Sequence, residues 1–105
     1  LPAETIEAMR AEFEARRDLI VRLFREIPNA VVPEPQGAFY LFPDLSAYLG
    51  GDDLALAAYL LDEAKVAVVP GSVFEGPGCV RLSYATGRPQ IEEGVARIAA
   101  ALAKL

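Results

Sequence analysis

The chain has 105 residues, of which 53% are apolar and 24% are charged, and it carries a formal net charge of −5. This length and composition are typical of one globular domain and exclude a disordered segment. The sequence has no run of Lys and Arg that would displace counterions from a phosphate backbone, so we expect no nucleic-acid partner. No apolar stretch is long enough to span a bilayer and no signal-peptide pattern is present, so we expect no membrane partner and a cytoplasmic location.

The sequence contains no histidine and a single cysteine, Cys79. The chain therefore lacks the commonest general base and the commonest metal ligand, and one thiol makes neither an intrachain disulfide nor a thiolate cluster. We expect no metal site and no Ser–His or Cys–His nucleophile. Cys79 is interpreted as a small buried residue at the head of a strand.

The first predicted element is one long helix over residues 3–27. Pro2 suits a helix start, and Pro28 followed by Asn29 ends the pattern. Apolar residues recur along it at helical spacings, namely Ile6, Met9, Phe13, Leu19 or Ile20, Leu23 and Ile27. A helix of this length is expected to extend beyond the local core and to pack against another part of the protein.

An extended stretch follows over residues 30–45. Its prolines at 33 and 35 indicate an edge or an entry segment, because proline donates no ladder hydrogen bond. Residues 37–42 favour a central strand, which Pro43 and Asp44 end.

The middle of the chain predicts a helix and then a strand. Asp52 or Asp53 offers an N-cap for a helix that runs to about Ala64. Residues 66–69 are rich in β-branched side chains and predict a strand, closed by a turn at Pro70-Gly71.

A second turn at residues 75–78 leads into a third strand over residues 79–84, and a last helix begins near residues 87–89. Its apolar stripe consists of Ile91, Val95, Ile98, Leu102 and Leu105. The order α-β-α-β-β-α predicts an α+β fold, a two-layer sandwich in which helices lie mainly on one face of a small mixed sheet. The opposite sheet face is then left for a partner or a ligand.

The third strand carries an arginine at its centre. Alternation places Val80, Leu82 and Tyr84 on one face and Arg81 on the other. A guanidinium can hold a carboxylate through two parallel hydrogen bonds. The ordinary alternative is an arginine on a solvated strand face, paired with a nearby Asp or Glu, and spacing alone favours that alternative.

Four blocks of sequence decide between these interpretations. They are Arg16-Arg17-Asp18-Leu19, Pro35-Gln36-Gly37-Ala38-Phe39-Tyr40, Val66-Ala67-Val68-Val69-Pro70-Gly71-Ser72-Val73-Phe74 and Val80-Arg81-Leu82-Ser83-Tyr84-Ala85. In this order they resemble the C-terminal small domain of fold-type I pyridoxal-phosphate-dependent aminotransferases of the aspartate aminotransferase group. The resemblance covers nearly the whole chain, although Glu75 stands where the family often has glycine.

The resemblance implies roles for three residues at the substrate. Arg81 is expected to bind the substrate α-carboxylate, with Gly37 and Phe39 beside it. Gly37 lets the backbone approach a ligand, although an ordinary turn glycine gives the same pattern, and Phe39 is equally consistent with a core position. The resemblance further implies that residues 1–27 form a helix of the interdomain type and residues 30–105 the sandwich.

The same resemblance implies a cofactor that this chain does not hold. The family needs a Schiff-base lysine, but Lys65 and Lys104 are the only lysines, and both sit at helix ends as solvated charges. Pyridoxal 5'-phosphate is therefore expected in a missing large domain. This chain is expected to contain no catalytic, cofactor-binding or metal-binding residue, and to be inactive alone.

The predicted function is part of an aminotransferase that moves an amino group between an L-amino acid and a 2-oxo acid, with this domain closing over the site. Its expected partners are the substrate, its own large domain and a second copy in a homodimer. Two alternatives stay open at this point. One is a non-catalytic module for amino-acid binding or dimerisation, and the other is a related β-lyase or decarboxylase that uses the same cofactor.

Overall fold

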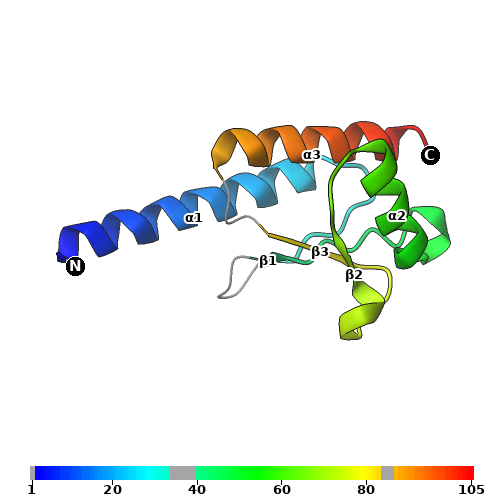
Figure 1. The fold of residues 1–105 in the computed structure, drawn as a ribbon, viewed down its shortest axis with the longest axis horizontal. Coiled ribbons are helices and arrows are strands. Elements are labelled where there is room, and N and C mark those ends of the chain that lie inside the picture. The colour runs from blue at the N-terminus through cyan, green and yellow to red at the C-terminus, as the bar shows by residue number, and fades with distance from the viewer. Residues whose placement is uncertain (1, 34–39, 84–86) are drawn as a thin grey trace.

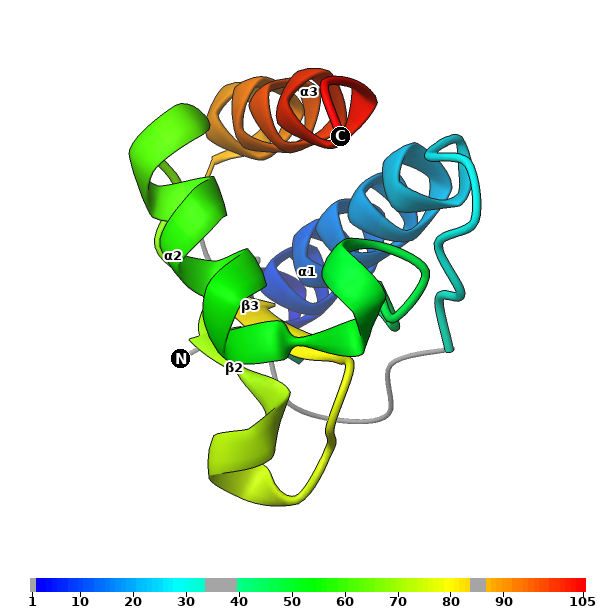
Figure 2. The same cartoon turned by 90° about the vertical axis from the view of Figure 1, so that its right-hand side faces the viewer.

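The chain folds into three helices and a three-stranded sheet in a computed structural model, which describes residues 2–33, 40–83 and 87–105. The elements in chain order are α1 (Ala3–Arg25), β1 (Tyr40–Leu41), the 3-10 helix η1 (Leu49–Gly51), α2 (Asp53–Glu63), β2 (Val69–Pro70), the 3-10 helix η2 (Gly71–Phe74), β3 (Val80–Ser83) and α3 (Arg88–Ala103). This order confirms the predicted α+β arrangement. Helices α1 and α3 lie side by side over one face of the sheet, and α2 runs past its β2 edge (Figures 1 and 2).

The sheet has the strand order β1-β3-β2, so β3 is the central strand. Tyr40 pairs with Ser83 in one ladder, and Val69 pairs with Arg81 in the other. Both described ladders are antiparallel, whereas a mixed sheet was expected. For the β2–β3 pair the reason is the short connection. Residues 71–79 form a tight loop, and a parallel pair needs a much longer crossover.

The strand predicted over residues 66–69 lies further along the chain, at Val69–Pro70. Pro70 was predicted as a turn residue, yet it pairs with Val80. A proline is tolerated there because β2 is an edge strand, whose outer N–H groups have no ladder partner to lose.

The other two strands agree with the prediction over their described parts. β1 contains two of the residues expected in the strand at 37–42, and residues 37–39 lie outside the described residues. β3 occupies Val80–Ser83, within the predicted 79–84, and Tyr84 also lies outside the described residues.

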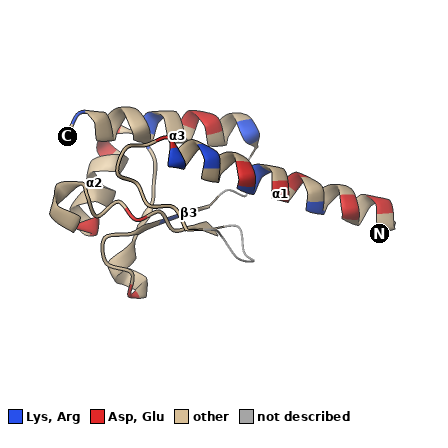
Figure 3. Cartoon of the chain, turned by 180° about the vertical axis from the view of Figure 1, so that it is seen from behind, with Lys and Arg blue, Asp and Glu red and all other residues tan. Residues whose placement is uncertain are grey.

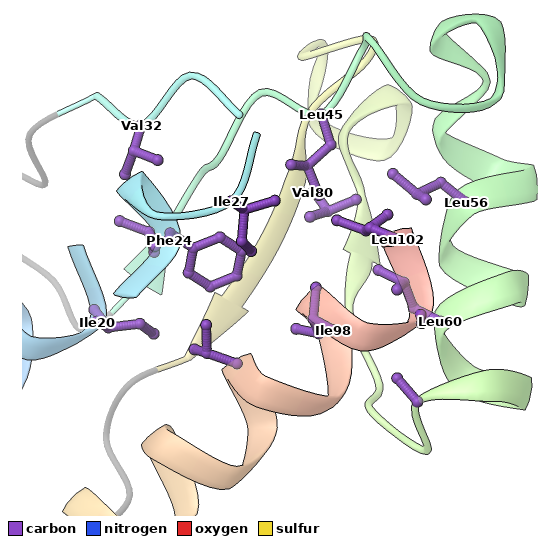
Figure 4. Packing of buried hydrophobic residues seen from close by; sticks show 14 of the residues in the cluster. Ile20, Phe24, Ile27, Val32, Leu45, Leu56, Leu60, Val80, Ile98 and Leu102 are labelled. Atoms are coloured by element: carbon purple, nitrogen blue, oxygen red, sulfur yellow. The ribbon is translucent and has the colours of Figure 1, made fainter. Parts of the chain in front are cut away.

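The core fills the space between the helices and the sheet (Figure 4). Its largest fully buried side chains include Phe24 of α1, Leu60 of α2 and Val80 of β3. The apolar stripe predicted for the last helix is buried at Ile91, Val95, Ile98 and Leu102. Leu105 is the exception, because it lies beyond the end of α3 and is 51% exposed.

The N-terminal half of α1 projects away from this core (Figure 1). Ile6 and Met9 are 54% and 49% exposed, and the first buried residue of the helix is Ile20. Acidic and basic residues are interspersed along this projecting part (Figure 3). The helix therefore extends beyond the local core, as its length suggested.

Candidate functional site

The central strand presents Arg81 on the sheet face opposite the core. Val80 is 1% exposed and Leu82 packs against the core cluster, so the predicted alternation is confirmed for these residues. Arg81 lies between them in the strand and is half-buried. A side chain at this position is fixed at its base by the middle strand of the sheet.

Two aromatic rings contact the guanidinium of Arg81. Its Cζ atom lies 4.6 Å from the ring centroid of Tyr40 and 5.8 Å from that of Phe74. Phe42 packs edge-to-face on Phe74, with ring centroids 5.2 Å apart and an interplanar angle of 78°. The site thus combines one cation with a group of aromatic side chains, to which we refer as the aromatic cluster (Tyr40, Phe42 and Phe74).

The structure does not pair Arg81 with an Asp or Glu in the described residues. Across residues 2–33, 40–83 and 87–105, no carboxylate forms an ion pair with Arg81. Aromatic rings interact with the faces of a guanidinium and leave its N–H groups, which point outward in its plane, free to donate. The arrangement is suited to a planar carboxylate that accepts two parallel hydrogen bonds.

The register of the sheet explains why β1 supplies aromatics to Arg81. The ladder that pairs Tyr40 with Ser83 continues past β1, since the Val80 N–H donates to the Pro43 carbonyl oxygen at 3.2 Å. Phe42 therefore stands opposite Arg81, and the pleat alternation puts both on the outer face. Tyr40 and Phe42 are 41% and 40% exposed, which leaves an apolar wall beside the cation open to a ligand.

Phe74 reaches the site from the loop between β2 and β3, residues 71–78. The Gly71 N–H donates to the Cys79 carbonyl oxygen at 2.7 Å, and the Gly76 N–H donates to the Gly71 carbonyl oxygen at 2.7 Å. Glu75 adopts a left-handed conformation, with φ of 64°, at the end of the short η2 helix. This is the position where the sequence departs from the family pattern, and here a glutamate adopts a backbone conformation that favours glycine.

Asp53 anchors that loop from the start of α2. Its Oδ2 atom accepts hydrogen bonds from the Ser72 hydroxyl and from the Gly78 N–H, both at 2.8 Å, and its Oδ1 atom accepts from the Ser72 N–H at 3.2 Å. Asp53 is 3% exposed and is the one buried charged residue in the described part of the chain. A buried carboxylate is tolerated where donors satisfy it, and here three donors do so.

The two candidate N-cap residues thus have separate roles. Asp52 is the N-cap of α2, and its side chain accepts a hydrogen bond from the Ala55 N–H at 3.0 Å. Asp53 instead connects the helix to the loop that carries Phe74. The sequence alone does not distinguish the two aspartates, because both stand at the helix start and differ only in the direction of the side chain.

Asp53 makes the stability of the domain sensitive to acid. The hydrogen bonds from Gly78 and then from Ser72 lower the pKa of its carboxyl below the ordinary value of 3.8. A folded-state pKa below the unfolded value means that the stabilisation is complete above the unfolded pKa and is lost as pH falls through the folded one. We expect the difference in unfolding free energy between the wild-type chain and Asp53→Asn to be constant near neutral pH and to shrink below about pH 4, as measured by urea unfolding. A difference that stays constant down to pH 3 would contradict this.

The sequence also singled out Gly37, Phe39 and Cys79. Gly37 and Phe39 lie outside the described residues. Cys79 is half-buried, and its backbone pairs with that of Asp44 in an isolated antiparallel β-bridge. Burial raises the pKa of its thiol, which disfavours a reactive thiolate. Cys79 was expected to be buried at the head of a strand; it is only half-buried and directly precedes β3.

Both lysines of the chain are exposed and lie at the ends of helices. Lys65 is exposed just past the end of α2. Lys104 lies at the end of α3, where its Nζ atom donates to Glu63 at 3.2 Å with both side chains largely in solvent. In the part of the chain that the structure describes, no group of three or more His, Cys, Asp or Glu residues is placed to hold a metal, and no helix is both long and apolar enough to cross a membrane.

Known proteins that are similar to this chain are aminotransferases. Residues 2–98 match the family described as aminotransferase class I and II. The chain is 50% identical over 103 residues to a probable aspartate/prephenate aminotransferase of Aquifex aeolicus, covering 95% of this chain and 26% of that protein. The aspartate aminotransferase of Streptomyces avermitilis is 48% identical over 101 residues, which cover 89% of this chain and 25% of that protein.

Solved structures match over the same region. The aspartate aminotransferase from Rhizobium meliloti superposes with a TM-score of 0.93 at 37% identity, covering 100% of this chain and 28% of that one. An aromatic aminotransferase from Pyrococcus horikoshii gives a TM-score of 0.88 at 38% identity, covering 96% of this chain and 27% of that one. The chain thus spans about a quarter of the length of the relatives that it matches.

Proposed function

The chain belongs to the class I and II aminotransferases of fold type I, and from this premise we propose that it is the substrate-carboxylate-binding small domain of an enzyme that transfers an amino group between an L-amino acid and a 2-oxo acid. The relatives named for aspartate support aspartate as the first amino donor to test. Because this chain spans about a quarter of their length, the rest of the enzyme is expected to come from residues outside it.

The observation that carries the proposal is the setting of Arg81. Its guanidinium has aromatic rings near it and no carboxylate partner in the described residues, so its N–H groups are available to a substrate carboxylate. A carboxylate held by two parallel hydrogen bonds is fixed in orientation as well as in position. Arg81 would in this way hold the substrate so that its α-hydrogen faces the base that removes it.

Gly37 and Phe39 are proposed to line the same pocket. Phe39 directly precedes Tyr40 in the sequence and Gly37 lies three positions before it, and Tyr40 contacts Arg81. We further assign residues 1–27 to a helix between domains, on which the small domain moves to close over the substrate and exclude water. The exposed Ile6 and Met9 support this assignment, because they offer apolar surface to another part of the enzyme.

Pyridoxal phosphate is proposed to be held by residues outside this chain, since neither lysine present fits it. The cofactor supplies the electron sink that amino-group transfer needs. This chain then contributes substrate binding and closure but no covalent step, so alone it is expected to be inactive. Homodimer formation and a cytoplasmic location stay predictions.

The full-length enzyme tests this assignment through its mass and its products. Borohydride reduction is expected to add a pyridoxyl group to the full-length chain, and aspartate with a 2-oxo acid is expected to yield the matching amino acid without release of ammonia. Release of ammonia or carbon dioxide would identify a β-lyase or a decarboxylase instead. A chain that gains no pyridoxyl group would favour the non-catalytic binding module.

A further inference from the structure

Among the described residues, Asp53 is the one buried charge that the proposed function does not use. Its three hydrogen-bond donors belong to Ser72 and Gly78, which stand near the two ends of the loop over residues 71–78. One carboxylate therefore ties both ends of the loop to the first turn of α2. Ser72 and Gly78 are 19 and 25 positions from Asp53 in the sequence, so these hydrogen bonds fix the position of the loop relative to the start of α2.

The residue at the middle of this loop contacts the candidate substrate site. Phe74 follows Ser72 by two positions, and its ring lies 5.8 Å from the Arg81 Cζ atom and 5.2 Å from the ring of Phe42. Arg81 thus has one aromatic neighbour, Tyr40, that is held by the sheet ladder. Its other neighbour, Phe74, is held by a loop whose two ends are bonded to Asp53.

We propose that Asp53 is a positioning residue for substrate binding, which acts through the loop at residues 71–78 and the Phe74 ring to hold the Arg81 guanidinium in its carboxylate-binding orientation. This inference rests on the proposed function, because it takes Arg81 as the group that binds the substrate carboxylate. Asp53 itself is buried and does not reach the open sheet face, so its effect on the substrate is indirect.

The test compares Asp53→Asn with Asp52→Asn in the full-length enzyme carrying its cofactor. The amide at position 53 keeps the size of the side chain but replaces one acceptor oxygen with an NH2 group, so Ser72 and Gly78 are no longer both satisfied. Asp52 is a matched control, because it is the neighbouring aspartate, caps the same helix through Ala55, and has no hydrogen bond to the loop. Both variants remove one negative charge from the start of α2, and Asp53→Asn also weakens the attachment of the loop.

The measurements are KM and kcat for aspartate, and the Kd of succinate, a dicarboxylate that does not react, by titration calorimetry. We expect Asp53→Asn to raise KM and the succinate Kd about five- to tenfold while kcat changes less, because the anchor is displaced but the reacting groups are intact. Asp52→Asn keeps the cap, because an asparagine oxygen accepts the Ala55 N–H equally well, and is expected to leave KM and Kd unchanged. If Asp53 has only a structural role, Asp53→Asn is expected to leave KM and the succinate Kd unchanged, as Asp52→Asn does.

A double-mutant cycle separates this inference from the proposed function. In an Arg81→Ala background, Asp53→Asn is expected to change the succinate Kd by less than about twofold, since the group through which it acts is gone. An equal effect in both backgrounds, or no effect of Asp53→Asn on KM and Kd in the wild type, would overturn the positioning role alone. If Arg81→Ala itself leaves KM and Kd unchanged, the proposed carboxylate role of Arg81 fails, and this inference fails with it.

A milder variant keeps the test available if Asp53→Asn does not fold. Ser72→Ala removes only the hydroxyl donor to Asp53 Oδ2 and leaves the two backbone donors in place. The expected rise in KM and in the succinate Kd is then about two- to threefold, smaller than for Asp53→Asn because both backbone N–H donors still hold the loop. Wild-type values in a folded Ser72→Ala enzyme would overturn the positioning role.

Discussion

Replacing Arg81 by alanine in the full-length enzyme is expected to raise KM for the amino-acid substrate about 100-fold, because it removes a charge-assisted, bidentate contact worth roughly 3 kcal/mol. The guanidinium has no carboxylate partner in the described residues, so its removal leaves no protein charge unpaired. The loss should therefore appear in substrate binding and not in folding. Steady-state kinetics together with thermal unfolding of the same preparation measure both effects.

Two further variants sharpen this prediction. Arg81→Lys keeps the charge but loses the planar pair of N–H groups, so we expect a rise in KM of about tenfold, between wild type and alanine. Arg97→Ala removes an exposed arginine of α3 that pairs with Glu93, and is expected to leave KM unchanged. A KM within about twofold of wild type in Arg81→Ala would contradict the carboxylate role of Arg81.

The position of Arg81 followed from sequence because it depends on local geometry. Successive residues of a strand point to opposite faces, so apolar Val80 and Leu82 on either side of Arg81 were enough to turn its side chain away from the core. The helical stripe of α3 followed for the same reason, since a period of 3.6 residues identifies the buried face without knowledge of its partner. The stripe predicted for α1 was wrong in part, because Ile6 and Met9 are exposed while the buried Val21 and Phe24 were not in it. The element order and the two-layer class followed from these periods.

The neighbours of Arg81 were harder to predict, because they come from distant parts of the chain. Tyr40 and Phe42 precede it by about 40 positions, and only the β1–β3 register brings them to the same face. A signal was nevertheless present. Tyr40 and Phe42 flank the fully buried Leu41, so period-two alternation in this segment already indicated two aromatics on the outer face.

Asp53 and β2 show where local rules are insufficient. Capping preferences accept aspartate at position 52 or 53 equally, and the choice depends on donors from Ser72 and Gly78, which are 19 and 25 positions away. β-Branched residues favoured a strand at 66–69, yet pairing with β3 selects Val69–Pro70. In both cases a tertiary contact decides between local alternatives of similar stability.

Replacing Gly71 by alanine is expected to destabilise the chain by about 4 kcal/mol or more, at the upper end of single substitutions. A Cβ atom at this position would lie 1.8 Å from the Gly76 carbonyl oxygen and 2.5 Å from the Cys79 carbonyl oxygen, and both are backbone atoms that no rotamer change can move. To admit it, the loop must break the hydrogen bonds that join Gly71 to Cys79 and to Gly76. Urea unfolding of the 105-residue chain, read by circular dichroism, measures the loss.

Gly94→Ala is the matched control for this prediction, because it makes the same chemical change in the interior of α3. A Cβ atom there would meet nothing within 4 Å, so the substitution adds helix propensity without a clash. We expect it to stabilise the chain by about 0.5–1 kcal/mol. Opposite signs at the two glycines would show that the loop at residues 71–78 is closed around Gly71, as the contacts describe. A Gly71→Ala chain as stable as wild type would mean that the loop opens at little cost, and Asp53 would then have no rigid loop through which to hold Phe74 against Arg81.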